Sequence, residues 1–162
     1  MNTWEFEDLI NQMKQSTVPR RLIFIWSGQT TGLEDVLEGI ETHHCDLVFS
    51  QSKDSSSINE PESLLETFLN DECKSYCKKR NEPSALIVND AILLARYGCD
   101  LSGLFRYGIS PRSAVILTFP SESNRPFPIK AENWAIRNTR AIMQRVSKQL
   151  GESKCIIEVA GG

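Results

Sequence analysis

The segment from Ser27 to Gly32 combines two glycines with three hydroxyl side chains and directly follows an unbroken apolar run, Leu22–Trp26. An apolar run of this length predicts a strand that is covered on both faces of a sheet. Apolar residues then recur at helical spacing up to Ile40. In such a strand-to-helix loop, backbone amides and the helix dipole favour an anion. We therefore expect a phosphate-binding loop, with the candidate residues Ser27, Gly28, Thr30, Thr31 and Gly32.

The same segment can be compared with the P-loop pattern GxxxxGK[ST], in which the lysine meets the β/γ-phosphates and the hydroxyl residue meets magnesium. Aligned without gaps, Gly32 takes the second glycine position and Ser27 replaces the first. Leu33 then stands where the lysine is required, and Glu34 where the hydroxyl residue is required. Leucine brings no positive charge, and Glu34 repels a triphosphate. The pattern predicts a P-loop-like fold without ATP hydrolysis.

An acidic position is also expected after a later apolar strand, and the segment Ala85–Val88 followed by Asn89 and Asp90 is the candidate. Asn89 stands where a magnesium-side aspartate is required, and Asp90 where a catalytic acid follows. Asp90 therefore joins the candidate nucleotide-binding residues. Two alternatives stay open: turnover of ATP or GTP with groups supplied by a partner, and a plain strand-to-helix turn of an unrelated α/β fold.

The hydroxyl residues of this loop are also compatible with a flavin cofactor. Ser27, Thr30 and Thr31 also resemble the hydroxyl-rich phosphate loop of flavodoxin-like proteins, which makes FMN an alternative ligand. However, the segments 89–91 and 120–124 carry no aromatic residue to cover a flavin ring. The five cysteines have no metal-ligand spacing and predict reduced, mostly buried thiols. We expect neither a metal site nor a resident cofactor.

Apolar strands alternate with helices along the chain, which predicts an α/β fold. We expect one domain over residues 1–162, a three-layer sandwich around a mainly parallel sheet of about five strands, with P-loop NTPase-like topology. Helices are expected at 2–15, 33–40, 59–80 and 131–150. Strands are expected at 22–26, 47–49, 85–88, 114–119 and 156–159.

The net charge of −3 conceals an uneven distribution. Residues 125–154 contain seven Lys or Arg and two Glu, a local charge of +5 that leaves −8 for the rest. In the helix expected at 131–150, Arg137, Arg140 and Lys148 share one face. This stripe is a candidate surface for an acidic protein partner or for a nucleic-acid backbone. A solvated outer face of a packed helix is the alternative.

The order of these parts resembles the BrxF family of small P-loop proteins from BREX phage-defence systems. The resemblance covers about residues 1–120, and it rests on the segments 21–34, 64–69, 85–90, 100–105 and 108–119. It implies an accessory component of an antiviral or DNA-handling assembly. The departures at Leu33, Glu34 and Asn89 favour a catalytically inactive regulatory subunit that works through a larger protein partner.

The chain has no apolar run of the roughly 18 residues that a membrane span needs. Its first residues also lack the basic and apolar segments of a secretory signal. We expect a cytoplasmic protein without membrane contact.

Overall fold

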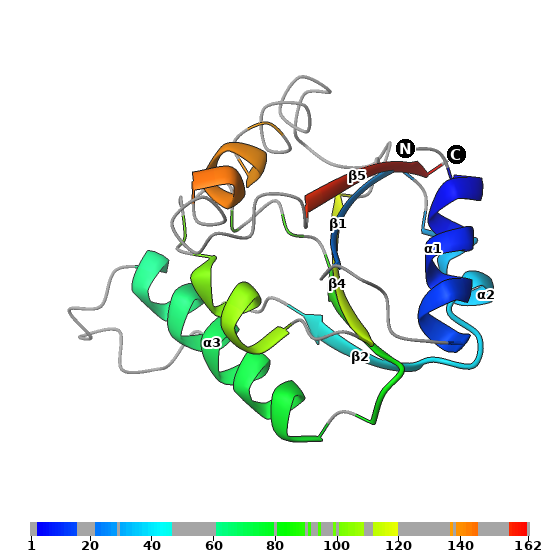
Figure 1. The fold of residues 1–162 in the computed structure, drawn as a ribbon. Helices are drawn as coiled ribbons and strands as arrows, with labels where there is room; N and C mark the ends of the chain where they lie inside the picture. Colours follow the sequence, from blue (N-terminus) through cyan, green and yellow to red (C-terminus); the bar gives the residue numbers. More distant parts are fainter. Residues whose placement is uncertain are drawn as a thin grey trace.

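A five-stranded sheet forms the centre of the molecule, with helices on both of its faces (Figure 1). The structure, a computed structural model, describes residues 3–15, 22–28, 30–46, 61–79, 81–89, 91, 94, 99, 101–108, 112–119, 137, 139–145 and 156–161. The helices are α1 (Thr3–Gln15), α2 (Leu33–Val36), α3 (Pro61–Lys79) and the π-helix η1 (Leu104–Gly108). The strands are β1 (Leu22–Gly28), β2 (Glu41–Asp46), β3 (Ser84–Asn89), β4 (Ser113–Phe119) and β5 (Ile156–Gly161).

The strands lie in the order β2-β3-β4-β1-β5, and every pairing between them is parallel. In β1, Phe24 stands opposite Ile116 of β4 on one side and Ile157 of β5 on the other. Residues 22–26 of β1, 84–88 of β3 and all of β4 are buried. This burial on both faces explains why these strands have continuous apolar sequences instead of alternating ones.

Each face of the sheet has its own apolar core. On one face, α1 and α2 cover alternate residues of the central strands, with Phe6 packed edge-on against Phe24 and Trp26 at ring-centroid distances of 4.8 and 5.1 Å. On the other face, α3, η1 and the helical residues 139–145 cover the intervening residues. The predicted α/β class, with a parallel sheet flanked by helices, is confirmed.

Cations tie the ends of α1 and α2 to their neighbours. Arg112, just before β4, donates from Nη2 to the carbonyl of Lys14 at 2.7 Å and from Nε to that of Met13 at 3.3 Å. Lys14 Nζ in turn donates to the carbonyl of Val36 at the end of α2, at 3.1 Å. Carbonyls at a helix C-terminus have no intrahelical partner, so these contacts stabilise both helices.

Two parts of the structure differ from the sequence predictions. A strand lies at Glu41–Asp46, where none was expected, and residues 47–49, where a strand was expected, are outside the described residues. The helix expected up to Ile40 is reduced to the single turn of α2, although Leu33, Leu37 and Ile40 are buried as their spacing predicted. The turn at 37–40 leads directly into β2, which leaves no length for a longer helix.

The remaining helices agree with their predictions where the structure describes them. Residues 137 and 139–145 are helical, and the other residues of the helix expected at 131–150 lie outside the described part. η1 packs against α3, and at Gly103, directly before η1, an added Cβ would overlap the side-chain oxygen of Asn70. Among the described residues, no helix is both long and apolar enough to cross a membrane.

Candidate functional site

The candidate phosphate loop begins at the carboxyl end of β1. Ser27 and Gly28 are the last two residues of the strand, and Gly28 has a φ of 100°, a conformation that side chains disfavour. The Ser27 hydroxyl donates to the carbonyl of Val159 on β5 at 3.3 Å. This hydroxyl therefore already bonds to the sheet in this structure.

The rest of the loop is a turn closed by its own backbone. The amide of Leu33 donates to the carbonyl of Thr30 at 3.0 Å, and Thr30, Thr31 and Gly32 are exposed. Of the sequence-predicted residues, Thr30, Thr31 and Gly32 are thus exposed and Ser27 and Gly28 are half-buried, while Asp90 is outside the described residues. Gly32 has a φ of −88°, and a Cβ added there would meet nothing within 4 Å. Neither backbone conformation nor space requires glycine at this position.

The residues after Gly32 are arranged unlike those of a nucleotide site. Leu33, at the position of the P-loop lysine, is only 3% exposed and packs in the core beneath α1 and α2. Glu34 and Asp35 are exposed in the only turn of α2. A helix of four residues has a small dipole, and two carboxylates in its first turn oppose an anion. The loop offers hydroxyls and amides without a nearby cation among its own residues.

A second group of polar side chains lies at the carboxyl ends of β2 and β3. Asn89 Nδ2 donates to Asp46 Oδ1 at 2.7 Å and also lies 3.1 Å from His44 Nδ1. Asn89 was a candidate from the sequence, but its partners His44 and Asp46 were not predicted, because no strand was expected at Glu41–Asp46. The available signal was that His44 and Asp46 are two residues apart, which puts them on one face of a strand.

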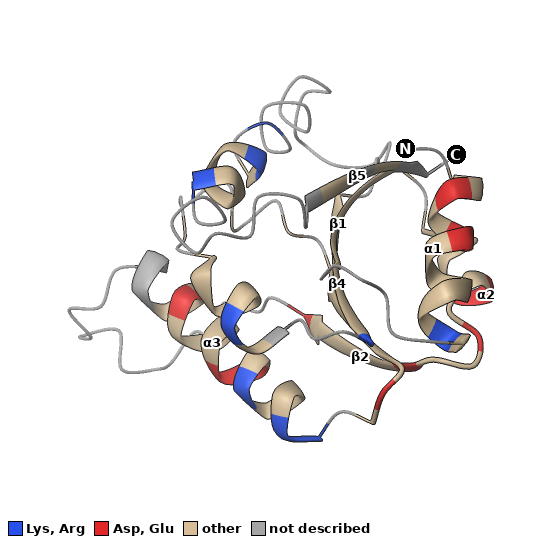
Figure 2. Ribbon diagram, viewed as in Figure 1, with Lys and Arg blue, Asp and Glu red and all other residues tan. Residues whose placement is uncertain are grey.

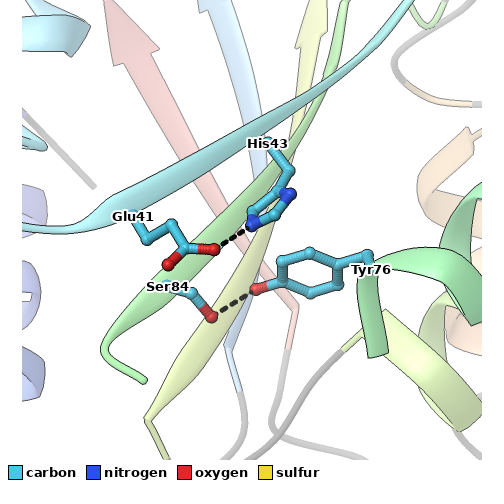
Figure 3. A network of polar contacts seen from close by, with 4 residues as sticks. All are labelled: Glu41, His43, Tyr76 and Ser84. Atoms are coloured by element: carbon cyan, nitrogen blue, oxygen red, sulfur yellow. Dashed lines mark hydrogen bonds and ion pairs between the residues drawn. The ribbon is translucent and has the colours of Figure 1, made fainter. Parts of the chain in front are cut away.

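A third group connects the start of β2 and β3 to α3 (Figure 3). His43 Nε2 lies 2.5 Å from Glu41 Oε1, and the Tyr76 hydroxyl lies 2.9 Å from Ser84 Oγ. The rings of His43 and Tyr76 meet edge to face at 5.0 Å, which joins the two pairs. The hydrogen bond with His43 lowers the pKa of the Glu41 carboxyl from its ordinary value of 4.5, with a smaller opposing effect of desolvation.

The cysteines of the described residues are free thiols, and Cys45, Cys73 and Cys99 are buried as expected. Burial raises the pKa of Cys45 and of Cys73 to about 12 each, and the nearby Glu72 carboxylate adds to both shifts. Such thiols stay protonated at neutral pH and are poor nucleophiles and metal ligands. Within the described ranges, no group of three His, Cys, Asp or Glu side chains could hold a metal ion.

The described part of the helix expected at 131–150 lies on the α3 side of the sheet, whereas α2 belongs to the α1 side (Figure 1). Arg137 is exposed and Arg140 is half-buried, whereas Lys148 is outside the described residues. Thr139 and Met143 face the core. Of the predicted basic stripe, the described residues Arg137 and Arg140 thus belong to a helix on the other side of the sheet from α2.

No protein-family model matches this chain, and a search of curated proteins finds no match either. The resemblance to BrxF therefore rests on the sequence segments quoted for it.

Proposed function

We propose that this protein is a catalytically inactive P-loop-like subunit that acts through protein contacts as an accessory or regulatory component. The observation that carries the proposal is the burial of Leu33, which is 3% exposed at the position where a P-loop has its lysine. The chain uses this position to anchor α2 in the core. A side chain at this position packs inward and cannot reach a phosphate in the loop.

The strand order supports a P-loop-like fold. Read from β5, the strands follow the order 5-1-4-3-2, and the loop in question follows β1. In the P-loop-like fold that we propose, β4 lies between the strand of the phosphate loop and β3, which ends at the magnesium-side position Asn89. Flavodoxin-like folds instead use the order 2-1-3-4-5, so the sheet gives no support to an FMN site. Because folds and functions are separable, the strand order supports the fold and carries no evidence about activity.

The end of β3 supports the loss of magnesium chemistry. Asn89 stands at the magnesium-side position and carries an amide in place of a carboxylate. Its Nδ2 donates to Asp46 and faces His44, so the side chain has a structural role within the sheet edge. Magnesium prefers carboxylate and water oxygens. The Asn89 carboxamide, held by these contacts, is a poor substitute for a magnesium-binding carboxylate.

The resemblance to BrxF suggests the setting, an assembly that defends against phage or handles DNA. In such an assembly an inactive subunit would bind other proteins through its surface and would not hydrolyse a nucleotide.

The direct test is calorimetric titration of the whole chain with Mg–ATP and, separately, Mg–GTP. We expect no saturable heat from either nucleotide. Thr31→Ala alters the exposed loop, and Thr42→Ala alters an exposed threonine on β2 as the matched control.

Saturable binding that is lost in Thr31→Ala and kept in Thr42→Ala would overturn the proposal, because the loop would then be a working nucleotide site. Saturable binding kept in both variants would overturn it as well, because a nucleotide would bind elsewhere on the chain. Absence of binding in all three proteins supports it.

A further inference from the structure

One side of the molecule is strongly acidic and carries an exposed tryptophan. Residues 3–15 and 30–40 contain six carboxylates and one Lys, a net charge of −5 against −3 for the whole chain. The single cation, Lys14, has its amine bonded to the carbonyl of Val36. All six carboxylates are exposed, and we call them, together with Trp4, the acidic face: Glu5, Glu7, Asp8, Glu34, Asp35 and Glu38.

Trp4 projects from this face. Its side chain is 73% exposed, and it is the one exposed large hydrophobic residue among those that the structure describes. On α1, Glu7 and Asp8 lie one turn from it, so carboxylates border the ring. In protein interfaces a few residues supply most of the binding free energy, and tryptophan is among the residue types enriched at those positions.

The opposite side of the sheet carries a complementary group, which we call the basic face: Lys74, Lys78, Arg106 and Tyr107. Lys74 and Lys78 are exposed one turn apart in the second part of α3, and Arg106 is exposed on η1. Lys74 Nζ lies 5.6 Å from the centre of the half-buried Tyr107 ring. The carboxylates of α3 precede this group, ending at Glu72. Figure 2 shows the blue residues of α3 and η1 across the sheet from the red residues of α1 and α2.

From these two faces we infer that the chain associates with a second copy of itself, with the acidic face of one copy on the basic face of the next. The carboxylates would pair with Lys74, Lys78 and Arg106. The indole of Trp4 would lie against Tyr107 and its cations, a contact that is favourable through aromatic packing and cation–π attraction. Both halves of the contact are present in one chain, which favours a second copy over a different partner.

The arrangement determines the type of association. The acidic face covers the α1 side of the sheet and the basic face covers the α3 side. An interface between two different faces is heterologous, so each copy keeps one unused face and further copies can add, giving a ring or a filament. Such an interface is distinguishable from a symmetric dimer, in which the same face meets itself.

The test begins with sedimentation velocity of the full chain over a range of protein concentrations at low ionic strength and in about 1 M salt, where charges are screened beyond about 3 Å. We expect mass above that of the monomer at low salt and a monomer at high salt. Trp4→Ala should weaken association at least about tenfold. Gln15→Ala, at an exposed position at the other end of α1, is the matched control and should leave association unchanged.

Two variants that each disable one face give the decisive measurement: Trp4→Ala/Asp8→Lys for the acidic face and Lys74→Glu/Arg106→Glu for the basic face. Each should be monomeric alone, because both faces are needed in every contact. Mixed in equal amounts, they should form dimers and nothing larger, since one intact acidic face meets one intact basic face. All four positions are exposed or half-buried at the surface, and circular dichroism verifies that the variants fold.

A monomer at every concentration and at low salt overturns the inference, as does association that Trp4→Ala leaves unchanged or a mixture that stays monomeric. This result is independent of nucleotide binding, because the variants leave residues 27–32 untouched. Failure of self-association and failure of the proposed function are therefore separate outcomes.

Discussion

The loop after β1 and the pair of strands β2 and β3 are both polar, and they differ in what their side chains contact. In the loop, Thr30 and Thr31 are exposed, and a backbone hydrogen bond from Leu33 to Thr30 closes the turn. Along β2 and β3, side chains bond to one another across strands and to α3. The loop after β1, whose composition suggests a ligand site, is a turn closed by its backbone. Strands β2 and β3, whose sequences look unremarkable, are joined by specific polar side-chain contacts.

This difference has a physical origin in the position of each region in the sheet. β1 is a central strand, and its loop is anchored from below by the buried Leu33. β2 is an edge strand with alternating exposed positions at Thr42, His44 and Asp46. An edge strand gains little from apolar burial on its open face, so polar cross-strand pairs such as that of Asp46 with Asn89 contribute to its pairing with β3.

The largest effect is expected from restoring the P-loop lysine. Leu33→Lys should lower the free energy of unfolding by about 3 kcal/mol, because it removes a buried leucine and places an amine in an apolar core. We also expect that it confers no binding of Mg–ATP. Urea denaturation and calorimetric titration measure the two outcomes.

Leu33→Met is the control for this prediction and should cost less than about 1.5 kcal/mol, since it keeps the volume and the apolar character. If Leu33→Lys were as stable as Leu33→Met and bound Mg–ATP, the loop would be a phosphate site that lacks only its cation. The comparison between the two regions would then be reversed.

Most of the sheet could be predicted from the sequence, because β1, β3 and β4 are buried on both faces and their continuous apolar runs lie within the strands. β2 could not. Its residues Glu41–Asp46 are mostly polar, and Cys45 is its one buried side chain. The neighbouring residues 47–49 are apolar, so the sequence predicted a strand there and not at Glu41–Asp46. The contacts of His43 and His44 were therefore not predicted.

The candidate site was predicted in composition and missed in arrangement. Hydroxyls and glycines at Ser27–Gly32 identify a loop after a buried strand, and the structure has that loop. Sequence alone could not show that α2 stops at Val36, because Leu37 and Ile40 continue its apolar spacing. It also could not show that Ser27 bonds to Val159, since β5 is more than a hundred residues away along the chain.

A moderate effect is expected in the β2–β3 region, from its buried pair. Tyr76→Phe should lower the free energy of unfolding by about 1–2 kcal/mol, because it removes the hydroxyl that bonds to Ser84, which is 0% exposed. The double variant Tyr76→Phe/Ser84→Ala should cost less than the sum of the two single changes, since it removes both members of the Tyr76–Ser84 hydrogen bond together. Chemical denaturation of the three variants gives this coupling directly. Strict additivity would mean that the pair makes no cooperative contribution, and the contrast with the loop would lose its main support.

The smallest effect is expected at the exposed end of the same network, and it depends on pH. The folded pKa of Glu41 is lowered by its hydrogen bond with His43, so its contribution to stability is complete above its ordinary value of 4.5 and is lost as the pH falls through the folded value. Glu41→Gln should therefore be slightly less stable than the unmodified protein at pH 6 and should approach it in stability as the solution is acidified below about pH 4.5. Thermal unfolding of both proteins from pH 3 to pH 6 measures the difference. His43→Gln should reduce the same pH dependence without abolishing it, because hydrogen bonds from Asn81 also lower the pKa of the Glu41 carboxyl. A difference in stability that stays constant from pH 3 to pH 6 would contradict this prediction. It would show that the contact between Glu41 and His43 makes no electrostatic contribution to the stability of the fold.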